Sequence, residues 1–327
     1  MTDTACVTRF RIAAAAVAPA CVALLLGGFA EAQPPANATG LIKENARIQV
    51  SPHVTVILDD NAPFVPNVGI VVGDRGTLVV DTGIGERNGR IVLSEARKVS
   101  KNTEFYTAAT HYHPEHDLGA TAFPASAKML RWRDQQKEAD ELGADIMSRF
   151  AGFSPAIAEL LKGAKFRPAD IVFDDAIVLD LGGVHVRVWG VGPTHTRGDT
   201  VFFVEEDKVL LAGDVVMPVF VAASGQSSSI TKWLADLDEF DKLNPTKVIP
   251  AHGRMGGIEL IRRQREYLAA VQSGVAAAKR EGKSLEDTTK QLAEPIASKF
   301  PDLATGGGGP ATGRVTAAIQ AAYREAK

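Results

Sequence analysis

The segment Thr110-His111-Tyr112-His113-Pro114-Glu115-His116-Asp117-Leu118-Gly119 places three histidines and two carboxylates within ten residues. Alternate side chains of an extended chain project to one side, so we expect His111 and His113 to face the same way. Pro114 then turns the chain, and Glu115 and His116 approach from a different direction. Neutral imidazole nitrogen and carboxylate oxygen are both ligands that zinc takes in proteins. The segment therefore predicts a metal site.

Three more ligand-type side chains follow predicted strands further along the chain. His195 lies in a glycine-bounded loop, 192–199, after a strand that ends near Val191. Asp214 and His252 each follow a short apolar run. A carboxylate at a strand end can bridge two cations through its two oxygens. Together with the histidine segment, these positions supply enough ligands for two metal ions.

Two of the seven histidines fall outside this pattern. His53 precedes a predicted strand and His185 lies within one, so both are assigned structural roles rather than ligand roles. The order, strand-end placement and flanking glycines of the other five make a coincidental grouping a poor explanation for them.

Two series of strands, separated by a helical insert, dominate the chain. Alternating or β-branched runs predict strands over 46–57, 68–80 and 105–109, then over 171–181, 184–191, 200–204, 208–211 and 247–249. Helical spacing predicts helices over 86–100, 229–243 and 255–280, with a final helix from Arg314. This order predicts an α/β (α+β) fold in one compact domain, with sheet packed on sheet and helices outside.

Composition shifts divide the chain into segments. Residues 1–32 are predicted to be a signal peptide, 33–45 a linker, 46–283 the main domain and 284–327 a C-terminal helical extension. Residues 133–165 form an insert rich in helix formers, which is a candidate lid over the site.

The histidine segment, His195, Gly213-Asp214 and Ala251-His252-Gly253 resemble, in the same order, the motif set of the metallo-β-lactamase superfamily. That resemblance implies a four-layer αββα sandwich of two mixed sheets with outer helices. It implies that one metal ion is bound by His111, His113 and His195, a second by Glu115, His116 and His252, and that Asp214 bridges them. It also implies that Asp81, in a matching Asp-Thr-Gly, is buried and orients the histidine loop. The expected cofactor is two Zn²⁺, with iron or manganese as alternatives.

The chain departs from that pattern at two positions. The aspartate of the family's histidine loop is Glu115 here, and the first glycine of the final Gly-His-Gly is Ala251. Alanine keeps a small residue before His252. The additional methylene of Glu115 moves its carboxylate by about a bond length, whereas metal distances are set to within about 0.2 Å. Glu115 is therefore the ligand on which the properties of the second site depend.

The first residues have the order of a secretory signal. Arg9 and Arg11 precede an apolar run, which ends in the small-residue stretch 30–32. A membrane anchor is the competing interpretation, but Pro19 interrupts the run and a polar, proline-containing stretch follows it. We expect a periplasmic or secreted protein with no stable membrane insertion after cleavage.

Both cysteines, Cys6 and Cys21, lie inside this leader, so a cleaved protein has no thiol for catalysis, metal binding or a disulfide. The formal net charge of -3 and pI near 6.2 provide no general basic field for nucleic acid. The expected partner is a small-molecule substrate, and nucleic acid is excluded.

The predicted function is hydrolysis of a small ester-like bond, in a lactone, a thioester or a related carbonyl compound, by metal-activated hydroxide. Glu115 and Asp214 are the candidate catalytic carboxylates for moving a proton. An acid at position 214 resembles the glyoxalase II and lactonase branches more than the zinc β-lactamases. Three alternatives stay open: a β-lactam hydrolase, an iron-dependent oxidoreductase similar to sulfur dioxygenases, and a non-catalytic periplasmic binding module.

Overall fold

The computed structural model describes residues 39–305 and 311–327. The predicted signal peptide and the first part of the linker therefore lie outside the described residues. Within the described ranges, no helix is both long enough and apolar enough to span a membrane.

The first sheet has seven strands in the order β1-β2-β3-β4-β5-β6-β7. The bounds are β1 Arg47–Gln49, β2 Val54–Ile57, β3 Val68–Val72, β4 Gly76–Val80, β5 Glu104–Ala108, β6 Lys128–Trp132 and β7 Ile171–Phe173. Strands β1 to β4 pair antiparallel, and β4 to β7 pair parallel. The helix α1, Gly85–Val99, provides the crossover that parallel pairing of β4 with β5 requires.

The second sheet has five strands in the order β12-β11-β10-β9-β8. The bounds are β8 Ala176–Asp180, β9 His185–Gly190, β10 Thr200–Val204, β11 Val209–Gly213 and β12 Lys247–Pro250. Only β11 and β12 pair parallel, and the helix α5, Ile230–Leu243, connects them. Both sheets are therefore mixed, as expected.

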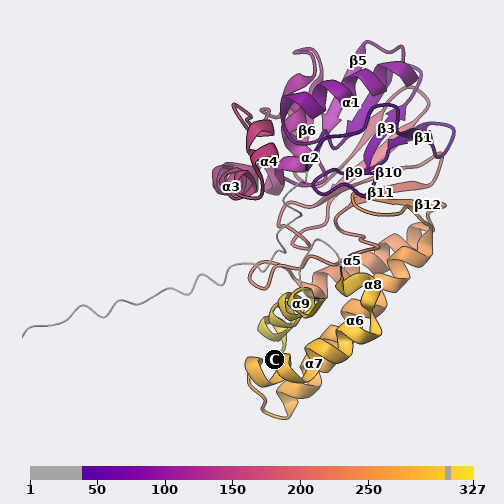
Figure 1. Cartoon of the computed structure of the whole chain (residues 1–327). Helices are drawn as coiled ribbons and strands as arrows, with labels where there is room; N and C mark the ends of the chain where they lie inside the picture. Colours follow the sequence, from indigo (N-terminus) through magenta and orange to yellow (C-terminus); the bar gives the residue numbers. More distant parts are fainter. Residues whose placement is uncertain (1–38, 306–310) are drawn as a thin grey trace, which may run out of the picture.

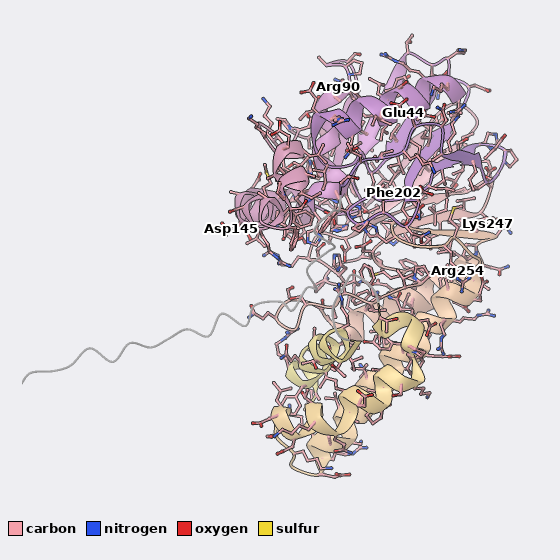
Figure 2. The ribbon with its side chains drawn as sticks, in the orientation of Figure 1. Glu44, Arg90, Asp145, Phe202, Lys247 and Arg254 are labelled. Atoms are coloured by element: carbon pink, nitrogen blue, oxygen red, sulfur yellow. The ribbon has the colours of Figure 1, made fainter. Side chains whose placement is uncertain are left out.

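The two sheets pack face to face, because successive side chains of a buried strand point to opposite faces. Leu78 of β4 points toward the second sheet, whereas the next residue, Val79, belongs to the cluster beneath α1. Phe202 of β10 is buried in the cluster between the sheets, and Figure 2 labels it in the interior of the molecule. Its neighbour Val201 packs on the helices of the other side.

Helices cover both outer faces, which confirms the four-layer sandwich (Figure 1). The helix α1 covers the first sheet. The helices α5 and α6, Ile258–Arg280, cover the second, and α7 Leu285–Lys299, α8 Pro301–Ala304 and α9 Ala311–Glu325 pack against them. One continuous apolar cluster runs from Leu210 of β11 to Ile319 of α9. The C-terminal extension therefore shares the core of the main domain.

The insert at 133–165 contains two helices, α3 Arg133–Ala151 and α4 Pro155–Leu160, beside the sheets (Figure 1). The single strand predicted over 171–181 is wrong. Its first part, β7, pairs with β6 in the first sheet, and its second part, β8, pairs with β9 in the second. The two aspartates 174 and 175 form the exposed break, and their local polarity does not reveal that the chain changes sheet there.

A buried ion pair connects the histidine segment to the first sheet. Arg131 of β6 donates through both terminal nitrogens to Asp117, and both side chains are fully buried. Asp117 lies next to His116, in the short helix α2, Pro114–Asp117. Since the pair is removed from water, each charge depends on the other.

We expect Arg131→Met to lower the free energy of unfolding by about 3 to 5 kcal/mol, because it leaves the Asp117 carboxylate buried without its cation. Arg133→Met, which breaks an exposed pair with Asp174, is the control and should change stability little. Urea unfolding followed by circular dichroism measures both. Equal midpoints for the two variants would contradict the prediction.

Candidate metal centre

The predicted ligand residues lie in four loops that follow strand ends. The loop after β5 leads through His111 and His113 into α2, which holds Glu115 and His116. The other three loops follow β9, β11 and β12, one in each case, and hold His195, Asp214 and His252. Both sheets therefore contribute to one site.

All seven predicted residues come together in three overlapping groups whose ligand atoms lie within 4.8 Å of one another. The groups are His111, His113, His195; His111, His116, Asp214; and Glu115, His116, His252. The first and third groups have the composition expected for the two metal sites. His53 and His185 lie elsewhere and bind Asp207 at 2.8 Å and Glu206 at 2.6 Å, consistent with structural roles.

Asp214 lies between the two groups of histidines. One carboxylate oxygen, Oδ2, is 3.6 Å from His195 Nε2, and the other, Oδ1, is 3.9 Å from His252 Nε2. Burial raises the pKa of Asp214, but the nearby histidines outweigh burial and leave the pKa below its usual value. The carboxylate is therefore ionised at neutral pH, and each oxygen faces a different group.

The outward nitrogens of the histidine rings are held by hydrogen bonds to the protein. The Nδ1 atoms of His195 and His252 contact the carbonyl oxygens of Ala222, at 2.6 Å, and Val65, at 3.1 Å. A carbonyl oxygen only accepts, so Nδ1 of each ring carries a proton, and the Nε2 atom of the neutral ring presents its lone pair to the cluster. This is the tautomer that a metal ligand requires.

Several atoms that point into the cluster are suited to bind a cation. His111 Nε2, His116 Nε2 and Asp214 Oδ1 are buried and have no hydrogen-bond partner among the described residues. A buried polar atom without a partner is costly, and a bound ion is one of the few ways to satisfy it. Burial and the neighbouring histidines lower the pKa of His111 and His113 well below the usual value, so both rings are neutral at pH 7.

Asp81 fixes the histidine segment, as the sequence predicted. It follows β4 with a φ of 65°, and its side chain is almost fully buried. Its carboxylate accepts from the Thr110 backbone N–H at 2.8 Å and contacts His116 Nδ1 at 3.0 Å. Burial lowers the pKa of His116, but the charges of Asp81, Glu115 and Asp214 outweigh it and raise the pKa to about 9.

Two residues of the loop between β2 and β3, Asn67 and Asp59, position the loop of His252. The Asn67 side-chain amide donates to the carbonyl oxygens of Pro250, at 3.0 Å, and Gly253, at 2.9 Å. The Asp59 carboxylate accepts from Gly253 N–H at 2.7 Å. Sequence reasoning missed both, since their only local signal is a polar residue in a loop between apolar strands.

The insert helix α3 supports two ligand loops. Gln135 donates to the carbonyl oxygen of Ala109, at 2.8 Å, and Glu138 accepts from the N–H groups of Arg197, at 3.1 Å, and Gly198, at 2.8 Å. These bonds connect the first half of α3 to the loop before His111 and to the loop of His195. This half of the insert is a wall of the site, a role that the sequence did not predict for these two residues.

A cavity of about 170 Å³ opens beside the histidines of the first group. Its wall includes His113 and His195, the insert helix α3, the serine-rich loop 224–229 and the helix α9. The final helix therefore contributes to the site as well as to the core, because Arg314 and Ala317 of α9 line the cavity. The cavity gives a substrate access to the site.

Comparison with known proteins agrees with this architecture. The model of the metallo-beta-lactamase superfamily matches residues 61–252. The linear primary-alkylsulfatase of Pseudomonas sp. (strain ATCC 19151) is 24% identical over 217 residues, which cover 57% of this chain and 41% of that protein.

Solved structures show the same fold. The stereoselective inverting sec-alkylsulfatase Pisa1 from Pseudomonas sp. is 14% identical with a TM-score of 0.68, over 84% of this chain and 50% of that one. A metallo-beta-lactamase from Pontibacter korlensis is 16% identical with a TM-score of 0.54, over 68% of this chain and 98% of that one. The chain spans half or less of the length of these alkylsulfatases.

Asp81→Asn should lower the affinity for the metal ions by about 10- to 100-fold, because the amide cannot hold Thr110 and His116 as the carboxylate does. The measurement is a competition titration of the purified protein with a chromogenic chelator. Asp207→Asn, which changes the partner of the remote His53, is the matched control. An Asp81→Asn protein with the affinity of the parent would remove the orienting role of Asp81.

Proposed function

Because the chain belongs to the metallo-β-lactamase superfamily, we propose that it is a hydrolase with two metal ions, zinc in first place, that cleaves a small ester-like substrate. The observation that carries this proposal is the convergence of the seven predicted ligands beside a cavity, with Asp214 between the two groups. The family match and the alkylsulfatase relative both support a metal-dependent hydrolase.

In this proposal, His111, His113 and His195 would hold the first ion, Glu115, His116 and His252 would hold the second, and Asp214, which lies between the two groups, could serve either. When bound, the ions would supply Lewis acidity that lowers the pKa of water from about 15.7 toward about 7. Imidazole binds a metal as a neutral ligand, so an ion held by the first group would keep its full positive charge.

The two carboxylates have different tasks. Asp214 is ionised and held between the groups, so it fixes their separation. Glu115 lies in the first turn of α2, and its Oε1 is 3.7 Å from His116 Nε2. Since its longer side chain has more freedom than an aspartate, we assign Glu115 the transfer of a proton toward the leaving group.

Two ester classes are candidates for the substrate. Lactones, thioesters and related carbonyl esters follow from the acid at position 214. Sulfate esters are the second class, because a curated relative is named a linear primary-alkylsulfatase. Both classes place a polar oxygen beside the leaving group, so the same ligand set serves either.

We also propose that residues 1–32 direct export and that the enzyme acts in the periplasm or outside the cell. N-terminal sequencing of protein from the periplasmic fraction of a Gram-negative expression host should begin at Gln33. Recovery from the cytoplasm with residues 1–32 intact would contradict this proposal.

A panel of lactones, thioesters, sulfate esters, phosphoesters and β-lactams tests the function. We expect turnover of at least one ester class by the metal-loaded protein, and its loss in the His111→Ala/His113→Ala variant, which lacks two ligands of the first ion. His185→Ala, which changes a histidine outside the cluster, should keep full activity. Metal content is measured on every preparation.

Two outcomes would contradict the hydrolase. Fully metal-loaded protein without turnover on the whole panel would indicate a binding module. Bound iron together with thiol-dependent oxygen uptake would indicate an oxidoreductase.

A further inference from the structure

One face of the insert helix α3 lines the cavity. Glu138, Leu142, Ile146 and Arg149 all line it, and their spacing places them on one side of the helix. Glu138 is bound to the loop of His195, which fixes the beginning of this face. The half-buried Arg149 is its last member, three turns further on.

One face of α9 forms the opposite wall. Gly313 and Ala317 line the cavity, and Gln320 and Arg324 continue the same face toward the serine-rich loop. Arg324 donates to the carbonyl oxygens of Gly225 and Ser228. A Cβ at Gly225 would lie 2.4 Å from Gln320 Oε1, so glycine permits the close approach.

The other side of α9 is anchored in the core. Val315, Ile319 and Ala322 are buried in the cluster that extends to the second sheet. The helix therefore has a fixed rotation, and this rotation directs Arg314 to the cavity. Its guanidinium lies 4.6 Å from the ring centroid of Phe220, and that ring stacks on His252 at 6.4 Å.

A third arginine, Arg197, also lines the cavity and pairs with acids of α3. Arg197 contacts Glu141 at 2.5 Å and Glu138 at 3.6 Å. These contacts hold its charge against the insert. Arg149 and Arg314 place two further positive charges on opposite walls, beside His113 in one case and near His252 in the other.

The remaining wall is mostly small or apolar, with Leu142, Ile146, Ala222, Ala223 and Ala317 among its residues. Such a wall suits a short apolar part of a substrate beside the charged groups. A guanidinium binds a sulfate or carboxylate through two parallel hydrogen bonds, which a neutral group cannot match.

We propose that Arg149 and Arg314 bind an oxyanion of the substrate, a sulfate or a carboxylate, and make the site selective for small anionic esters. This inference rests on the proposed function for the scissile bond, whereas the binding of the anion itself does not. The insert and the last helix are then specificity elements, positioned outside the ligand loops.

Equilibrium binding to the purified full chain, with equal metal content in every variant, tests the inference directly. The probes are propyl sulfate, butanoate and the neutral match butyramide, measured by titration calorimetry. Arg149→Gln and Arg314→Gln should each weaken binding of the preferred anion by about tenfold or more, since hydrogen bonds to charged groups contribute about 1.5 to 3 kcal/mol. Butyramide binding should not change. The anion whose affinity falls more in the glutamine variants identifies the group, sulfate or carboxylate, that the two arginines bind.

Two comparisons separate a local contact from a general effect. Lys137→Gln removes a positive charge from the exposed side of α3, next to Asp134, and should leave anion binding unchanged. Arg149→Lys and Arg314→Lys keep the charge without the two-pronged geometry, and should recover only part of the affinity. Thermal unfolding confirms that each variant is folded.

Catalysis provides the second measurement, on 4-nitrophenyl acetate, 4-nitrophenyl hydrogen succinate and 4-nitrophenyl sulfate. The glutamine variants should raise KM for the anionic esters and leave the acetate unaffected. If the parent protein turns over none of these esters, the result counts against the proposed function alone. The calorimetry still shows whether Arg149 and Arg314 bind an anion. Equal binding of anions by parent and glutamine variants, or no binding by the parent at millimolar concentration, would overturn the inference.

Discussion

A buried carboxylate at the end of β4 sets the geometry on which the site depends. Burying the charge of Asp81 is unfavourable, and it is compensated by the backbone N–H and hydroxyl of Thr110 and by the ring of His116. These same bonds fix where the histidine segment leaves β5 and how His116 is rotated. The positive φ of Asp81 directs the carboxylate under that segment. The position of the histidine segment therefore follows from one compensated charge.

The second constraint is that both sheets must keep their relative position. Asn67 and Asp59, in the loop that connects β2 and β3 of the first sheet, hold the loop of His252, which follows a strand of the second sheet. Glu138 holds the loop of His195 in the same way from the insert. The apolar interface between the sheets is continuous and close-packed. These hydrogen bonds therefore join segments that already have fixed relative positions.

The sequence was informative where a role depends on neighbours along the chain. The spacing from His111 to His116, and the strand ends before Asp214 and His252, predicted the cluster, because strand ends deliver side chains to loops. Strands 46–80 and the outer helices followed from periodicity. The sequence did not reveal β6, the change of sheet after β7, or the parts played by Glu138 and Arg314. Those depend on packing between distant segments, and a charged helix face has the same pattern whether it meets solvent or a cavity.

The candidate ligands and the helix α9 lie in different parts of the chain, and this separation has a consequence for how the cavity can change. The candidate metal ligands lie within 61–252, the range that matches the superfamily, whereas α9 lies beyond it. Exchanges on the cavity face of α9 alter the wall of the pocket and leave every ligand loop intact. Its buried face, in contrast, belongs to the common core and tolerates less change. Exchanges on one side of this single helix can therefore change which molecules fit the cavity, while the loops of the candidate ligands keep their sequence.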